Sequence, residues 1–258
     1  MIANGNGNGR GVGSDAIHRA HLSTRQQRPK RFYTIVEVEE SDGAFVVTLD
    51  GKTLRTPGRT LLALPNRAVA AAVAAEWEAQ AAEIDAMTMP VTRLVNSAID
   101  GVGARADAVR AEIVSYSGSD LLSYRATGPD ALIARQGALW DPLLAWAREE
   151  FGAAFEVGHG VVPIGQAATS LAAIAAALEP VDPLPLAALH VVTTLTGSAV
   201  IALAVARGKI TAEEAWVAAH VDEDWEIAQW GEDTEATARR AARWKEMEAA
   251  ALILRLAA

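Results

Sequence analysis

The 258 residues, 51% of them hydrophobic and 21% charged, are sufficient for two modest globular domains, each with a core of its own. A formal net charge of −9 at pH 7 argues against binding to nucleic acid or to an anionic membrane surface, because both require a basic face. The absence of cysteine excludes a disulfide framework, thiolate catalysis and cysteine-ligated metals, and it is typical of an intracellular protein.

Residues 1–31 differ in composition from the rest of the chain. Glycine and asparagine alternate over residues 4–9, Arg and Lys residues follow, and Asp15 is the only acid. This composition predicts a disordered tail. The glycines oppose the amphipathic helix of a mitochondrial import sequence, and the segment lacks the apolar stretch of a secretory signal.

Three short runs rich in β-branched and apolar residues come next, at residues 32–38, 44–49 and 61–64. Asp42-Gly43 separates the first two runs, and Asp50-Gly51 follows the second. These dipeptides favour hairpin turns between short strands. The sequence therefore predicts a small β-meander.

Three helices are predicted after the meander, at residues 67–82, 88–99 and 107–116. Asn66 is expected to cap the first helix, and Gly101 and Gly103 are expected to end the second. Strands that are followed by helices, rather than alternating with them, indicate an α+β domain. We place this domain at residues 32–127, because Thr127-Gly128-Pro129 is the best break available in the chain.

Residues 128–258 are predicted to form an all-α bundle. The expected helices cover residues 131–151, 167–178, 184–206, 211–230 and 234–256. Thr211 and Glu214 form a T-x-x-E capping box, which fixes the start of the fourth helix. The expected fold class is therefore α+β, with a small strand-containing domain followed by a helical one.

The stretch 184–206 is the longest apolar run of the chain and carries no formal charge. Its length is sufficient to cross a bilayer. Its polar side chains, including His190, Thr196 and Ser198, fit a helix surrounded by protein better than a helix exposed to lipid. We expect a buried central helix, with membrane attachment as the alternative. His190 is expected to be a hydrogen-bonded core histidine rather than a ligand.

The densest polar cluster lies at residues 220–226, which read HVDEDWE. His220, Glu223 and Asp224 share one helix face at spacings i, i+3 and i+4. This spacing is similar to that of zinc-binding helices but lacks their second histidine. The alternative function is therefore a metal-dependent hydrolase using these three residues, against the simpler interpretation of an exposed acidic face.

A continuous helix over residues 211–230 has two apolar strips. The strip expected to face the core contains Val217, Ala218, Val221, Trp225 and Ala228. The strip on the nearly opposite side contains Trp216, Glu223, Ile227 and Trp230. Such a helix is either buried from two sides or offers its second strip to a partner, since aromatic residues are enriched at interfaces.

Five segments of the chain carry a family resemblance. They are KRFY at residues 30–33, LDGKTLRTPGR at 49–59, AAEWEAQ at 74–80, MPVTRLVNSAIDGV at 89–102 and WEIAQWGEDTEA at 225–236. In this order they resemble the ATP synthase F1-sector assembly chaperones that act on the α subunit, and the resemblance extends over residues 30–256.

The resemblance implies an α+β N-terminal domain and an orthogonal helical C-terminal domain. It also implies a molecular chaperone that binds the free F1 α subunit and shields its interface until the β subunit replaces it, without catalysis or a cofactor. Because the tail is rich in Gly and Asn, we expect a bacterial cytoplasm, or the mitochondrial matrix if the protein is eukaryotic.

The predicted partner-binding residues come from two sources. Carried over from the resemblance are those of the acidic, tryptophan-rich segment: Trp225, Glu226, Trp230, Glu232, Asp233 and Glu235. The second apolar strip adds Trp216, Glu223 and Ile227. Aromatic anchors inside a charged rim suit a chaperone that must bind an apolar patch yet release it to the correct subunit.

Overall fold

The computed structural model describes residues 28–257, so residues 1–27 of the predicted tail lie outside the described part of the chain. Two compact units are present. In the first, residues 28–32 run beside residues 80–85, where the Arg31 N–H donates to the Ala82 carbonyl at 2.9 Å. The second contains residues 33–79 and the chain from residue 86 onward, with all the helices and strands described below. The domain boundary near residue 127 stays a prediction.

The β-meander predicted from the Asp-Gly dipeptides is confirmed. It consists of β1 (Val36–Ser41), β2 (Ala44–Leu49), β3 (Lys52–Thr53) and β4 (Ala63–Leu64). β2 pairs antiparallel with β1 on one edge and with the two short strands β3 and β4 on the other. Both residues of each Asp-Gly turn have positive φ, 53° and 78° at Asp42-Gly43 and 48° and 75° at Asp50-Gly51, as type I′ hairpins require.

Helical segments follow the meander, and the first of them packs on β1 and β2. They are α2 (Arg67–Glu78), the 3₁₀ turn Ala86–Thr88, α3 (Pro90–Ser97) and α4 (Ala106–Ser117). Asn66 caps α2 as predicted, because its side-chain oxygen accepts the Ala68 N–H at 2.7 Å. The start of α3 has no such local cap, and the Glu76 carboxylate of α2 accepts the Val91 and Thr92 N–H groups at 2.7 Å each. One side chain thus joins the two helices.

The predicted break at Gly101 and Gly103 is wrong. The chain instead continues from α3 through a π-helical turn, Ala98–Val102, and a 3₁₀ turn, Gly103–Arg105, directly into α4. Asp100 stabilises the π-helical turn from outside, because its carboxylate accepts the Thr56 hydroxyl at 2.6 Å and the Gly58 N–H at 2.8 Å. These two hydrogen bonds hold the pKa of Asp100 below its ordinary value. The contacts of Asp100 with Thr56 and Gly58 thus hold a helical conformation where the two glycines predicted the end of a helix.

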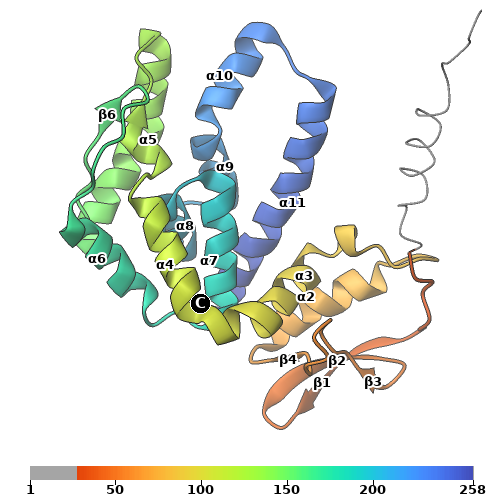
Figure 1. Cartoon of the computed structure of the whole chain (residues 1–258). Helices are drawn as coiled ribbons and strands as arrows, with labels where there is room; N and C mark the ends of the chain where they lie inside the picture. The colour runs from red at the N-terminus through yellow and green to blue at the C-terminus, as the bar shows by residue number, and fades with distance from the viewer. Residues whose placement is uncertain (1–27, 258) are drawn as a thin grey trace, which may run out of the picture. The chain divides into compact units, whose positions relative to one another are not determined.

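The rest of the chain is mainly helical, in agreement with the expected α+β class. Its elements are the 3₁₀ turn Leu121–Ser123, β5 (Tyr124–Arg125), α5 (Asp130–Phe151), β6 (Gly158–His159), α6 (Ala168–Leu178), α7 (Pro183–Thr196), α8 (Ala199–Ala206), α9 (Ala212–Ala219), α10 (Val221–Trp230) and α11 (Thr234–Leu256). Figure 1 shows α7 within this group, and α7 packs against α4, α8 and α11.

The run at residues 184–206 is buried as expected, but it forms two helices and not one. Gly197 ends α7 in the left-handed conformation, with φ of 69°. Ser198 then caps α8, where its hydroxyl accepts the Ile201 N–H at 3.0 Å. A glycine followed by a serine is a helix stop followed by a helix start. Among residues 28–257, no helix combines the length and the apolar character needed to cross a membrane.

The start of α8 also receives a buried carboxylate. Asp120 is 0% exposed, and it accepts the N–H groups of Leu122 at 3.1 Å and Val200 at 3.3 Å. Burial raises the pKa of Asp120 to about 6, against the opposing effect of hydrogen bonds from Ser198 and these backbone groups. Asp120 therefore joins the end of α4 to the centre of the helical core.

Candidate functional site

The predicted helix at residues 211–230 is divided at His220. The capping box is confirmed: Thr211 accepts the Glu214 N–H at 3.2 Å, and Glu214 accepts the Thr211 N–H at 2.8 Å. At His220, φ of −115° and ψ of 21° depart from helical values, so α9 ends and α10 begins there. The two strips of a continuous helix therefore do not form: Val217, expected in the core, is 41% exposed, whereas Trp216 is 8% exposed.

An aromatic cluster lies at this division between α9 and α10. The His220 ring lies 4.0 Å from the Trp216 ring, and its Nδ1 is 2.8 Å from the Trp216 carbonyl. Trp244 of α11 contacts Trp216 edge to face at 5.3 Å. Burial lowers the pKa of His220, and the nearby Arg240 and Arg243 guanidinium groups lower it further, against the Trp216 carbonyl and Glu223. The imidazole is therefore neutral at pH 7.

α5 holds the base of α10 from a second side. Gln136 is 0% exposed; its amide nitrogen donates to the Asp222 carboxylate at 2.7 Å, and its amide oxygen accepts the Ala126 N–H at 2.9 Å. The buried Trp140 Nε1–H donates to the Ala218 carbonyl at 2.8 Å. Gln136 thus joins α5 to the first turn of α10, and Trp140 joins α5 to the last turn of α9.

Beyond this base, α10 is mostly solvent-exposed. Val221 is its only buried residue, which contradicts the interpretation of a helix buried from two sides. The helix ends at Gly231, where φ is 89°, and α11 begins after Asp233, whose carboxylate accepts the Ala236 N–H at 2.8 Å. Asp224 of α10 and Arg240 of α11 form an ion pair at 2.6 Å. This ion pair joins the two helices, which lie on either side of the turn that connects them (Figure 1).

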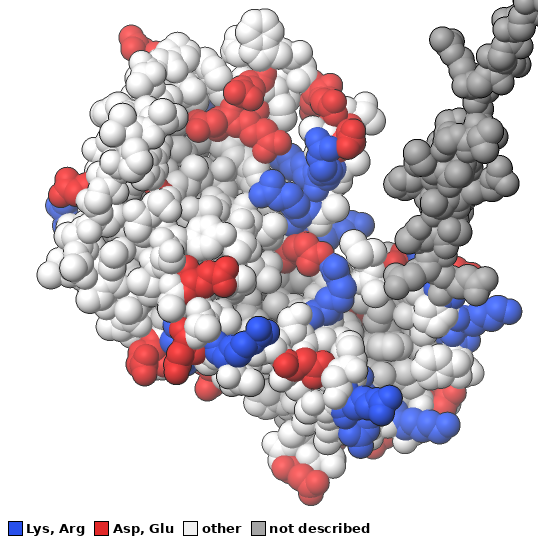
Figure 2. All heavy atoms as spheres, in the orientation of Figure 1, with Lys and Arg blue, Asp and Glu red and all other residues white. Residues whose placement is uncertain are grey.

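A groove of about 570 Å³ lies between these helices and the turn that joins them. Its lining residues are Glu223, Asp224, Glu226, Ile227, Trp230, Gly231, Glu232, Asp233, Ala236, Thr237 and Arg240. Trp230 is 87% exposed, more than any other described aromatic side chain. Figure 2 shows Asp and Glu side chains gathered where α10 meets α11, with Lys and Arg side chains below them. We call this feature the α10–α11 groove.

The groove brings together six of the nine predicted partner-binding residues: Glu223, Glu226, Ile227, Trp230, Glu232 and Asp233. The other three do not line it. Trp216 lies in the buried aromatic cluster, Trp225 is half-buried on α10, and Glu235 is exposed on α11 and pairs with Arg239 at 2.5 Å.

Sequence reasoning missed five lining residues, which are Asp224, Gly231, Ala236, Thr237 and Arg240. The sequence did contain a clue to Arg240, because residues 224 and 240 are equally distant in sequence from residue 232, where the chain turns. An antiparallel helical hairpin that turns there places Asp224 opposite Arg240.

His220, Glu223 and Asp224 do not form a metal site. The His220 Nε2 is 4.0 Å from the Glu223 carboxylate, and Asp224 faces Arg240. Within residues 28–257, no three His, Asp or Glu side chains converge on a point that could hold a metal ion. The geometry therefore gives no support to the alternative of a metal-dependent hydrolase.

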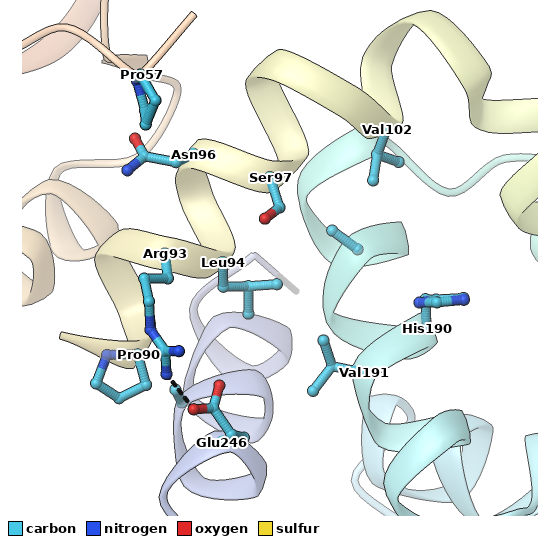
Figure 3. A pocket seen from close by; sticks show the side chains of 12 residues that line it. Pro57, Pro90, Arg93, Leu94, Asn96, Ser97, Val102, His190, Val191 and Glu246 are labelled. Carbon is cyan, nitrogen blue, oxygen red and sulfur yellow. Dashed lines mark hydrogen bonds and ion pairs between the residues drawn. The ribbon is translucent and has the colours of Figure 1, made fainter. Parts of the chain in front are cut away.

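A second cavity, of about 520 Å³, lies between α3, α7 and α11. Its walls are mainly apolar, and Figure 3 shows Arg93 of α3 reaching Glu246 of α11 at one side. His190 also lines it, 29% exposed, with its Nε2 3.1 Å from the Glu112 carboxylate. His190 thus lies at the edge of α7, near Glu112 but without a hydrogen bond at its Nε2, and it is not the hydrogen-bonded core histidine that was expected. The Arg93–Glu246 pair is internally neutral, so this cavity offers a ligand less charge than the α10–α11 groove.

Comparison with known proteins assigns the family. Residues 30–148 match the family model of the ATP12 chaperone protein. The structure of the Atu1473 protein of Agrobacterium tumefaciens shares 47% identity and a TM-score of 0.87, over 94% of this chain and 91% of that one. Atp12 of Paracoccus denitrificans shares 41% identity and a TM-score of 0.84, over 89% of this chain and 99% of that one. A point mutant of the Paracoccus protein gives the same identity and TM-score. The chain belongs to the ATP12 chaperone family, which confirms its resemblance to the ATP synthase assembly chaperones.

Proposed function

We propose that this protein holds the free α subunit of F1-ATPase through the α10–α11 groove, and that it releases the α subunit when the β subunit arrives. Family membership and the five ordered motifs support the assembly role. The observation that carries the choice of surface is Trp230, whose indole is 87% exposed among carboxylates in one of those motifs. Tryptophan is among the residues most enriched as anchors at protein interfaces, so an exposed indole inside a groove suits a partner-binding surface.

The arrangement of the groove suits a temporary partner. Trp230 and Ile227 supply apolar contact area, and aromatic anchors dominate binding energy at interfaces. The carboxylates around them remain hydrated until the partner docks, and such rim charges contribute mainly to association rate and specificity. The expected complex is therefore selective but weaker than the α–β contact that displaces it. In this proposal the protein binds its partner without catalysing a reaction and without a cofactor.

The proposed location is the cytoplasm of a bacterium, or the mitochondrial matrix if the chain is eukaryotic. It follows from the same family resemblance and from the proposed partner.

The test is to mix the purified chain separately with unassembled α and β subunits and to measure which subunit stays soluble and co-elutes with it. We expect retention of the α subunit alone, and release of the chain when the β subunit is added to the complex. Retention of the β subunit alone, or of neither subunit, would refute the proposed function.

The surface itself is tested by the double change Trp230→Ala and Glu232→Lys. Both side chains are exposed, so the fold should persist and the circular dichroism spectrum should be unchanged. Capture of the α subunit in a pull-down should fall at least tenfold, because an aromatic anchor and a rim charge are both lost. Unchanged capture by the folded variant would count against this surface.

A further inference from the structure

The α10–α11 groove has an apolar floor and an unbalanced negative charge. Ile227 and Ala236 are half-buried within it, and Trp230 stands at its exposed end. Its carboxylates are those of Glu223, Asp224, Glu226, Glu232 and Asp233. Arg240 is the only Lys or Arg that lines it, and Arg240 already pairs with Asp224 at 2.6 Å. The groove therefore presents negative charge that its own side chains do not neutralise.

The neighbouring groups leave this charge in place at neutral pH. The Ala236 and Glu235 N–H groups hold the pKa of Asp233 below its ordinary value. The nearest imidazole, that of His220, has its pKa lowered by burial and is neutral, so it offsets none of the charge of Glu223. Within residues 28–257, Glu226 has no ion-pair partner at all.

We propose that the α10–α11 groove takes a cationic segment of the partner, in which Lys or Arg side chains flank one large apolar side chain. The apolar side chain packs on Ile227 and Trp230, and the flanking cations meet Glu226 and Glu232. The proposal rests on the proposed function and specifies which chemistry of the partner is recognised. Selection works in both directions, because an acidic segment would be repelled by the same carboxylates that attract a basic one.

The first experiment neutralises two carboxylates that have no ion-pair partner among residues 28–257, without changing the size of their side chains. In the variant E226Q/E232Q, capture of the α subunit at low salt should weaken about tenfold, and its dependence on salt should become shallower. The matched control is E37Q/E40Q, which removes the same charge from exposed positions on β1 and should bind like the wild type. Equal affinity and equal salt dependence of E226Q/E232Q and the wild type would overturn the proposal.

The second experiment separates this inference from the proposed function. Two synthetic twelve-residue peptides, each with one central Phe, carry either four Lys or four Glu residues and are titrated into the full chain. The Lys peptide should bind and shift the tryptophan emission, and W230A should bind it roughly 30-fold more weakly. Preference for the Glu peptide, or no preference between the two, would overturn the inference even if the α subunit is captured. Capture of neither subunit together with selective binding of the Lys peptide would refute the proposed function alone.

A second copy of this chain is the competing occupant. Sedimentation of the chain alone should show a species whose mass is the same for the wild type and for E226Q/E232Q. A dimer that dissociates in the variant would show that the groove is filled by another copy and would overturn the proposal.

Discussion

At the residue scale, Asp120 combines full burial with an acceptor role for two different segments. Its carboxylate binds the N–H of Leu122, in the turn after α4, and the N–H of Val200, in the first turn of α8. Burial raises its pKa from 3.8 to about 6. The folded chain therefore binds a proton more tightly at this position than the unfolded chain does.

The first prediction follows from the sign of this shift. Because the pKa is raised in the folded state, the contribution of Asp120 to stability is complete below about pH 4 and is lost as pH rises through about 6. The loss should be roughly 3 kcal/mol of unfolding free energy. In urea titrations at pH 4.5 and 7.5, the wild type should lose more stability than Asp120→Asn over this interval. An equal change in the free energy of unfolding of the two proteins between these pH values would contradict the prediction.

A second prediction at this scale concerns Gln136, which is buried and bonds Asp222 at the base of α10. Asp222→Ala should lower the free energy of unfolding by about 1–3 kcal/mol, because the buried Gln136 amide nitrogen loses its acceptor, and it should speed amide hydrogen exchange most strongly across residues 221–230. The matched control is Glu226→Ala, an exposed acid on the same helix with no such bond. Equal exchange in both variants would show that Gln136 does not position α10.

At the scale of elements, two long predicted helices are each divided in two by one residue. Gly197 separates α7 from α8 with φ of 69°, and His220 separates α9 from α10. The first division was readable, since glycine followed by serine stops one helix and caps the next. The second could not be predicted, because the His220 ring lies on Trp216, and Trp216 in turn contacts Trp244 of α11, which is far away in the sequence.

The third prediction tests the first of these divisions. Gly197→Ala should destabilise the fold by roughly 1–2 kcal/mol, because an L residue is disfavoured in the left-handed conformation. An added Cβ there would approach only Leu121, at 3.9 Å, so the cost comes from the backbone and not from a clash. Gly165→Ala, where φ is not positive and no atom lies within 4 Å, should be nearly neutral. Similar unfolding midpoints for both variants would contradict this account.

At the scale of the whole molecule, local signals predicted the elements well and their contacts poorly. The α+β class, the two hairpin turns, the Asn66 cap, the capping box at Thr211 and the bounds of α11 followed from the sequence, because each depends on neighbours within a few residues. The groove did not follow. It requires Asp224 to meet Arg240 across the turn, and it requires Trp216 to point inward while Trp230 points outward.

The central claim is that the end of the molecule where α10 meets α11 is the surface that contacts the α subunit. A photoreactive benzophenone amino acid placed at Trp230, and separately at the 71% exposed Val162, tests it in the full chain. Irradiation with the unassembled α subunit should give a cross-linked product from position 230 and none from position 162, and prior addition of the β subunit should abolish it. Cross-linking from position 162 alone would contradict the account.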